Sequence, residues 1–158
     1  NFNGDLLLYS DIGEMRLNFT KCVFGGNINS RTYTGNTFFK SYHPVYTVPS
    51  NWEINTTNGN INVEIYQHEN MNANVIGEFN SNVGNIIFDY YDNSSLIGAR
   101  FVGSSGLSVV NFNSEDDSMG RFGNEFRSID YDTSLSKYSI NMKTGNGYVV
   151  VKASSSPD

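Results

Sequence analysis

Cysteine, proline and basic residues are all scarce in this chain of 158 residues. A single cysteine, Cys22, excludes an internal disulfide and therefore a small disulfide-stapled scaffold. No apolar run approaches the roughly 18 residues of a membrane span, and no signal peptide is recognisable. The chain does not begin with methionine and is expected to be cut from a longer protein. We expect one domain at 1–153 and a flexible tail at 154–158.

Charge is also sparse, and it is mostly negative. Charged residues make up 16% of the chain, and the formal net charge is -6. The 10 Lys and Arg are scattered, so neither nucleic acid nor membrane insertion is expected. Polarity comes instead from 23 Asn, 19 Ser and 15 Gly, and aromatic residues reach 14%. Neutral hydrogen-bonding groups beside amphipathic rings suit a neutral polar ligand such as a sugar.

Short runs of alternating apolar and polar residues dominate the sequence, as in 61–66 (INVEIY). Clusters of Gly, Asn, Asp and Ser separate these runs, which is typical of strands joined by turns. The predicted fold is all-β, a mostly antiparallel sheet or sandwich of about 8–10 strands without an internal repeat. Only residues 114–128 indicate a short helix, because Ser114 can cap it and Met119, Phe122 and Phe126 follow at helical spacing.

Signatures of catalysis and of metal binding are missing from the sequence. There are two histidines, His43 and His68, and neither belongs to a zinc-binding spacing. No nucleophile elbow, phosphate-binding loop or dinucleotide fingerprint occurs. The acidic runs lack the alternation that wraps a calcium ion. We therefore predict no catalytic residue, no metal and no cofactor.

Two alternatives to a binding function stay open. A small jelly-roll glycosidase needs two carboxylates roughly 5–10 Å apart, and Glu64 and Glu78 lie on strands that are expected to pair. The favoured interpretation of these two acids is exposure on a solvated face without any catalytic role. The other alternative is a structural module of a capsid, fibre or surface layer whose partners are other protein chains.

The stretch SYHPVYTVPSNWEI, residues 41–54, is the main candidate for ligand binding. Sugar recognition needs an aromatic face and planar polar groups, which this stretch and the preceding residues contain. The predicted glycan-binding residues are Arg31, Tyr42, His43, Asn51 and Trp52. Trp52 or Tyr42 would stack on the sugar, and the other three would bind its hydroxyls.

A buried Trp52 is the competing interpretation, because a lone tryptophan in an all-β domain often belongs to the core. The solvent exposure of the Trp52 ring distinguishes a role in sugar binding from a role in the core. If the ring is buried, the site moves to the hairpin around Tyr90 and Tyr91 or to the loop around Arg31.

Three segments together give the chain a family resemblance: NFTKCVFGGNINSRTYTGN, SYHPVYTVPSNWEI and INVEIYQHENMNANVIGEF. In overall character they resemble the receptor-binding heads of viral attachment proteins, most of all the glycan-binding spike head of rotaviruses. The resemblance implies a non-enzymatic host-attachment domain for cell-surface glycans, on the virion surface or otherwise extracellular. Because a single weak glycan site needs avidity, we also expect a larger, multimeric parent protein. No binding residue is carried over from the resemblance.

Overall fold

The computed structural model describes residues 3–68, 71–93, 97–115 and 119–154. Within these ranges the chain forms sixteen strands and no helix. The prediction of an all-β fold is therefore confirmed, although the strands are more numerous than expected. Of the predicted tail, Ser154 still belongs to the last strand and residues 155–158 lie outside the described ranges. The domain boundary at 153 stays a prediction.

Two large sheets and one small strand pair contain all of these strands. In spatial order, the eight-stranded sheet consists of β1 (Leu6–Ile12), β4 (Ile28–Thr34), β7 (Ser50–Asn58), β9 (Val75–Val83), β15 (Ser136–Asn146), β11 (Ile97–Ser105), β14 (Glu125–Ser128) and β13 (Met119–Phe122). The six-stranded sheet consists of β12 (Val110–Ser114), β16 (Val149–Ser154), β10 (Ile86–Asp92), β8 (Ile61–Gln67), β5 (Thr37–Tyr42) and β2 (Met15–Thr20). The small pair is β3 (Val23–Phe24) with β6 (Val45–Tyr46).

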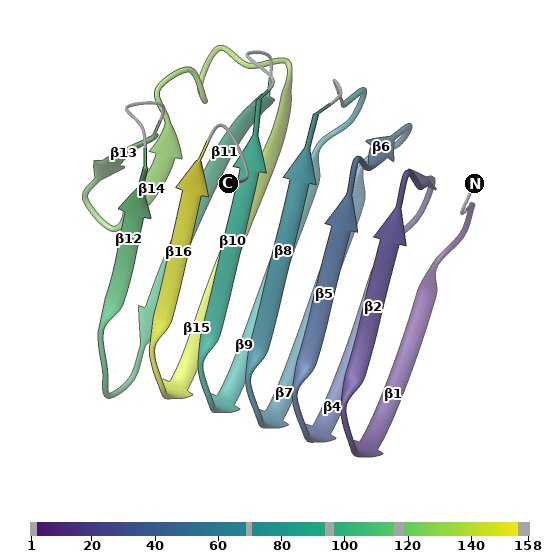
Figure 1. The fold of residues 1–158 in the computed structure, drawn as a ribbon, viewed down its shortest axis with the longest axis vertical. Coiled ribbons are helices and arrows are strands. Elements are labelled where there is room, and N and C mark those ends of the chain that lie inside the picture. The colour runs from purple at the N-terminus through teal and green to yellow at the C-terminus, as the bar shows by residue number, and fades with distance from the viewer. Residues whose placement is uncertain (1–2, 69–70, 94–96, 116–118, 155–158) are drawn as a thin grey trace.

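The two large sheets face each other as two layers, and the chain passes from one layer to the other at each tight turn (Figure 1). One strand from each sheet forms a coil, and successive coils stack, as in a parallel β-solenoid. Among the pairs described, only β11 with β14 and β13 with β14 are antiparallel. The prediction of a mostly antiparallel sheet is therefore wrong. The short turns are real, but they carry the chain into the opposite sheet instead of back along the same one.

A column of glycines forms the tight turns. Each of these glycines lies against the carbonyl oxygen of the corresponding glycine in the preceding coil. A Cβ added to any of them would lie 1.8–2.1 Å from that oxygen, and all have positive φ: Gly35, Gly59, Gly84 and Gly147. Contacts below 3.0 Å cannot be accommodated without moving backbone. Only glycine therefore allows the coils to stack this closely.

Asparagines beside the glycines tie one turn to the next. The Asn36 side-chain oxygen accepts a hydrogen bond from the backbone N–H of Asn60 at 2.9 Å. Asn60 accepts in the same way from Asn85 at 2.8 Å, and Asn85 accepts from Tyr148 at 3.1 Å.

The sequence was expected to lack an internal repeat. The repeat exists, and its unit is a coil of 22–25 residues, as the register of β1, β4, β7 and β9 shows.

The last coil of the chain is not the last coil of the stack. β15 lies between β9 and β11, and β16 lies between β10 and β12. After the fourth coil, formed by β9 and β10, the chain skips one position in the stack and forms β11 and β12 in the position beyond it. Strands β15 and β16 then occupy the skipped position. Every strand of the inserted coil has a parallel partner on both sides.

The segment expected to be helical forms strand instead. Within 114–128, Ser114 ends β12, and the hairpin of β13 and β14 follows; residues 116–118 lie outside the described ranges. Gly123 turns the hairpin with a φ of 66°. Met119 and Phe126 are buried, whereas Phe122 is largely exposed, so the three side chains do not share one helical face. Pairing of this hairpin with β11 outweighs a weak helix signal that Gly120 and Gly123 already reduce.

Candidate functional site

The outer face of the eight-stranded sheet carries rows of polar side chains that run across the strands. One row consists of Arg31, Asn55, Asn80 and Lys143, one residue each from β4, β7, β9 and β15. Each member is the Cα partner of the next, and none is buried. We call this set the axial row, because it follows the direction in which the coils stack.

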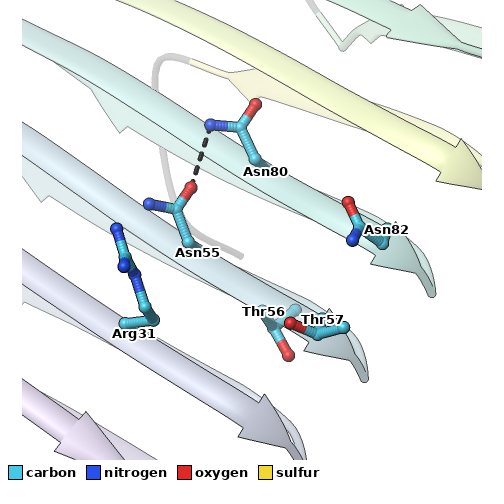
Figure 2. Close-up of a pocket in the computed structure, with 6 residues that line it drawn as sticks. All are labelled: Arg31, Asn55, Thr56, Thr57, Asn80 and Asn82. Atoms are coloured by element: carbon cyan, nitrogen blue, oxygen red, sulfur yellow. Dashed lines mark hydrogen bonds between the residues drawn. The ribbon is translucent and has the colours of Figure 1, made fainter.

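Hydrogen bonds orient the amides of the axial row. Asn80 donates through its side-chain nitrogen to the Asn55 oxygen at 3.0 Å, as Figure 2 shows. Asn55 in turn donates to a carboxylate oxygen of Glu53 at 2.7 Å, and the same oxygen lies 3.8 Å from the Arg31 guanidinium. These contacts use only part of each amide's hydrogen-bonding capacity. The remaining donors and acceptors face the solvent.

An open hollow of about 310 Å³ lies over this part of the sheet. Figure 2 shows Arg31, Asn55 and Asn80 standing side by side on neighbouring strands at its floor. Thr57 and Asn82 lie nearer the tight turns and complete the exposed lining. The lining is thus formed by hydroxyl, amide and guanidinium groups, and all of these can bind the hydroxyls of a polar ligand.

Two exposed tyrosines lie at the β1 side of the hollow. Tyr9 is the Cα partner of Arg31, and Tyr33 follows Arg31 by two residues on the same face of β4. Their side chains are 67% and 57% exposed. A hydrogen bond to Asp11, followed by the charge of that carboxylate, raises the pKa of the Tyr9 phenol, which therefore stays neutral at physiological pH. Aromatic rings beside amides are the combination that recognises carbohydrates.

The five predicted glycan-binding residues do not come together in one place. Arg31 lines the hollow, and Asn51 lies on the same face, where its backbone and side-chain N–H groups donate to Asn27. Tyr42 ends β5 in the other sheet, and His43 follows with its ring 4.2 Å from that of Tyr42. The two groups are thus on different faces of the molecule, and the predicted site was wrong as a single cluster.

Trp52 belongs to the core, and its prediction as a stacking platform was wrong. Its side chain is 1% exposed and packs against the rings of Phe39, Tyr46 and Tyr138 at centroid distances of 4.8–6.1 Å. The indole N–H donates to the Ser50 hydroxyl at 3.1 Å. The ring thus has no surface left for a sugar, because its faces contact other side chains and its polar group is paired.

Trp52→Ala is therefore expected to destabilise the fold by about 3–5 kcal/mol, as large-to-small changes at buried aromatic positions do. Chemical denaturation of the purified protein measures this loss. A matched control is Tyr33→Ala, which removes an exposed ring and should change the free energy of unfolding by less than about 0.5 kcal/mol. Equal stability of Trp52→Ala and the parent protein would contradict the core assignment.

Glu64 and Glu78 lie on different sheets, β8 and β9, so the two strands do not pair. Both side chains point outward, and the two outer faces look away from each other (Figure 1). Glu64 forms an ion pair with Lys40 at 2.7 Å, and Glu78 accepts a hydrogen bond from Asn141 at 2.8 Å. Two carboxylates on opposite faces cannot flank one glycosidic bond. The glycosidase hypothesis based on this pair is wrong.

Tyrosines also form a row on the outer face of the six-stranded sheet. Tyr66 stacks on Tyr91 with a centroid distance of 4.5 Å and an interplanar angle of 16°, and Tyr42 lies 5.1 Å from Tyr66 on the other side. Tyr66 therefore has a ring neighbour on each side. Tyr90, the other tyrosine of the predicted hairpin site, is buried and donates to Asp92. This row is better suited to holding coils together than to stacking on a sugar.

The described residues contain no group of three or more His, Cys, Asp or Glu side chains arranged to hold a metal ion. None of the segments described there is a helix with the length and apolarity needed to cross a bilayer.

Sequence reasoning selected Arg31, but it missed Tyr9, Asn55 and Asn80. Nothing local distinguishes these two asparagines from the other 21 in the chain. Their distance from the nearest Gly-Asn turn is the signal that could have found them. Asn55 precedes Gly59 by four residues, and Asn80 precedes Gly84 by the same number.

No protein-family model and no curated relative matches the sequence. Among solved structures, the fold is similar to the crystal structure of a proposed cell adhesion protein from Clostridium sporogenes. The alignment has a TM-score of 0.65 and covers 96% of this chain and 92% of that one. Because the sequence identity is 13%, the similarity establishes a shared all-β architecture, and it adds no support for a viral spike head.

Proposed function

We propose that this protein is a non-enzymatic attachment module that binds neutral glycans at a cell surface through the outer face of its eight-stranded sheet. The observation that carries the proposal is the hollow over Arg31, Asn55 and Asn80 beside the exposed rings of Tyr9 and Tyr33. Planar amides bind sugar hydroxyls, and an exposed ring covers the apolar face of a pyranose.

A neutral sugar fits the charges around the hollow better than an acidic one. The charge of Arg31 is opposed by Glu53, whose carboxylate lies 3.8 Å away. The chain as a whole carries a formal charge of -6. A sialic acid or sulfate group would therefore approach a surface with no excess of positive charge.

The fold similarity supports a role in attachment, because the similar structure is that of a proposed cell adhesion protein. An extracellular position and a larger, multimeric parent protein fit the same role. A single open site of this kind binds at millimolar to micromolar strength, about 4–8 kcal/mol, so several copies would be needed for firm attachment. A viral source stays a prediction from the sequence resemblance.

Binding to an array of neutral, sialylated and sulfated glycans tests the proposal. Tyr33→Ala should weaken binding to the neutral hits roughly tenfold, the equivalent of one lost aromatic contact. Asn80→Ala should weaken it about three- to tenfold, the equivalent of one or two hydrogen bonds. Asn62→Ala, which changes an amide on the outer face of the other sheet, is the matched control and should bind as the parent protein does.

Binding confined to sialylated or sulfated glycans would contradict the preference for neutral sugars. A complete absence of glycan binding, together with a stable oligomer in sedimentation, would instead favour the structural module of a capsid, fibre or surface layer.

A further inference from the structure

We infer that the ligand of this face is a linear neutral glycan that lies across the strands, along the stacking direction of the coils, and contacts several coils at once. This inference rests on the proposed function and specifies its ligand. Its basis is the repetition of polar groups in one direction, from coil to coil.

The axial row continues beyond the hollow on both sides. Arg31, Asn55, Asn80 and Lys143 occupy four adjacent strands. Tyr9 of β1 extends the row at one end, and Ser104 of β11 extends it at the other. Neighbouring strands lie about 4.8 Å apart, so the six positions span about 24 Å. A single sugar ring covers only a small part of this length, whereas an extended chain of sugars can cover all of it.

A second row runs parallel to the first and consists of Asn29, Glu53, Glu78 and Asn141 on the same four strands. Hydrogen bonds to the two carboxylates of this row orient its two side-chain amides. Asn29 donates to Glu53 at 3.0 Å, and Asn141 donates to Glu78 at 2.8 Å. Side chains that are already oriented lose less conformational entropy when a ligand binds. The fixed amides thus form a second ordered line of polar groups beside the axial row.

The charges of these rows select against an acidic polymer. Glu53 and Glu78 are Cα partners on adjacent strands, so two carboxylates lie beside the middle of the axial row. The cationic side chains, Arg31 and Lys143, lie at the two ends of the four-residue row. A chain with a carboxylate or sulfate on each sugar would place negative charges beside both acids.

The shape of the hollow favours an internal segment of a glycan over its terminal sugar. A site for a chain end is typically an enclosed pocket that buries most of its ligand. Here the exposed lining comes from side chains that stand on a sheet surface, such as Arg31, Asn55 and Asn80 (Figure 2). Asn82 and Thr57 bound the hollow toward the tight turns and leave the direction of the axial row open.

Titration calorimetry with oligosaccharides of increasing length tests this inference, with linear β-glucan, xylan and mannan series of one to six sugars and branched neutral glycans as probes. We expect a linear series to bind, with affinity rising at least tenfold between two and five sugars. Arg31→Ala and Lys143→Ala should each weaken binding of the hexasaccharide several-fold, because one long ligand reaches both ends. Lys137→Ala, on the same strand but outside both rows, is the control.

Three results would overturn the inference while leaving glycan binding intact. These are affinity that is independent of chain length, hits confined to branched or terminal sugars, and Lys143→Ala binding as tightly as the parent protein. If no sugar of any length binds on the array or in the titration, the proposed function itself fails. The two failures are therefore distinguishable in one set of measurements.

Discussion

Gly84→Ala is expected to lower the free energy of unfolding by more than about 4 kcal/mol, or to prevent folding. The added Cβ would lie 1.9 Å from the Gly59 carbonyl oxygen, which belongs to backbone and cannot turn away. Gly84 also has a φ of 144°, which an alanine adopts only at a cost of about 1–3 kcal/mol. Its N–H donates to Asn146 and its carbonyl oxygen accepts from Thr144, so any shift of this turn also disturbs the inserted coil.

Gly13→Ala separates the effect of the contact from the effect of the backbone angle. Gly13 forms the equivalent turn of the first coil with a φ of 129°, but a Cβ there would meet nothing closer than the Ser10 hydroxyl at 4.0 Å. We expect this variant to lose only about 1–3 kcal/mol. Urea unfolding measures the free energy of unfolding of both variants. If Gly13→Ala and Gly84→Ala lost similar amounts of stability, the close contact between stacked turns would not be what makes Gly84 necessary.

Removal of residues 136–158 is expected to abolish cooperative unfolding altogether. The deletion takes away β15 and β16, and β9 and β10 thereby lose the parallel partners that separate them from β11 and β12. It also removes Tyr138, Ile140 and Met142 from the core. Both sheets would be interrupted in their interior, where unpaired backbone groups are costly.

Thermal unfolding followed by circular dichroism measures this effect. The matched control ends after Ser154, which retains every described strand and should melt as the full chain does. A sharp transition in the shorter chain would show that the first four coils are stable without the insertion. In that case the last coil would be an accessory to the fold.

The strands were predictable because their burial alternates, and the alternation is visible in segments such as 61–66. The direction of pairing was not predictable from the same residues. A Gly-Asn turn between two alternating runs is typical of a hairpin, and only its recurrence at Gly35, Gly59 and Gly84 indicates a solenoid. The next turn of the column comes 63 residues later, at Gly147, because a displaced coil and a hairpin intervene. That interruption hides the repeat.

The candidate site was only partly predictable for a related reason. Arg31 could be selected because arginines are few. Asn55 and Asn80 belong to the site only because the fold places each beside a residue 24 or 25 positions away in the sequence. Trp52 was predicted to stack on a sugar, and its neighbours in the sequence, Asn51 and Glu53, are polar. Side chains alternate along β7, however, so these two neighbours point outward and the indole of Trp52 points inward.

The displaced coil also has a consequence for synthesis on the ribosome. Strands β11 and β12 leave the ribosome before β15 and β16, which lie between them and the coil of β9 and β10. Until the C-terminal residues emerge, β11 must either remain without its parallel partner or pair with β9 and later release it. Exposed strand edges of this kind are where nascent chains misassociate. The chain therefore cannot complete its fold in the order in which it is made, because its last strands lie between strands that leave the ribosome earlier.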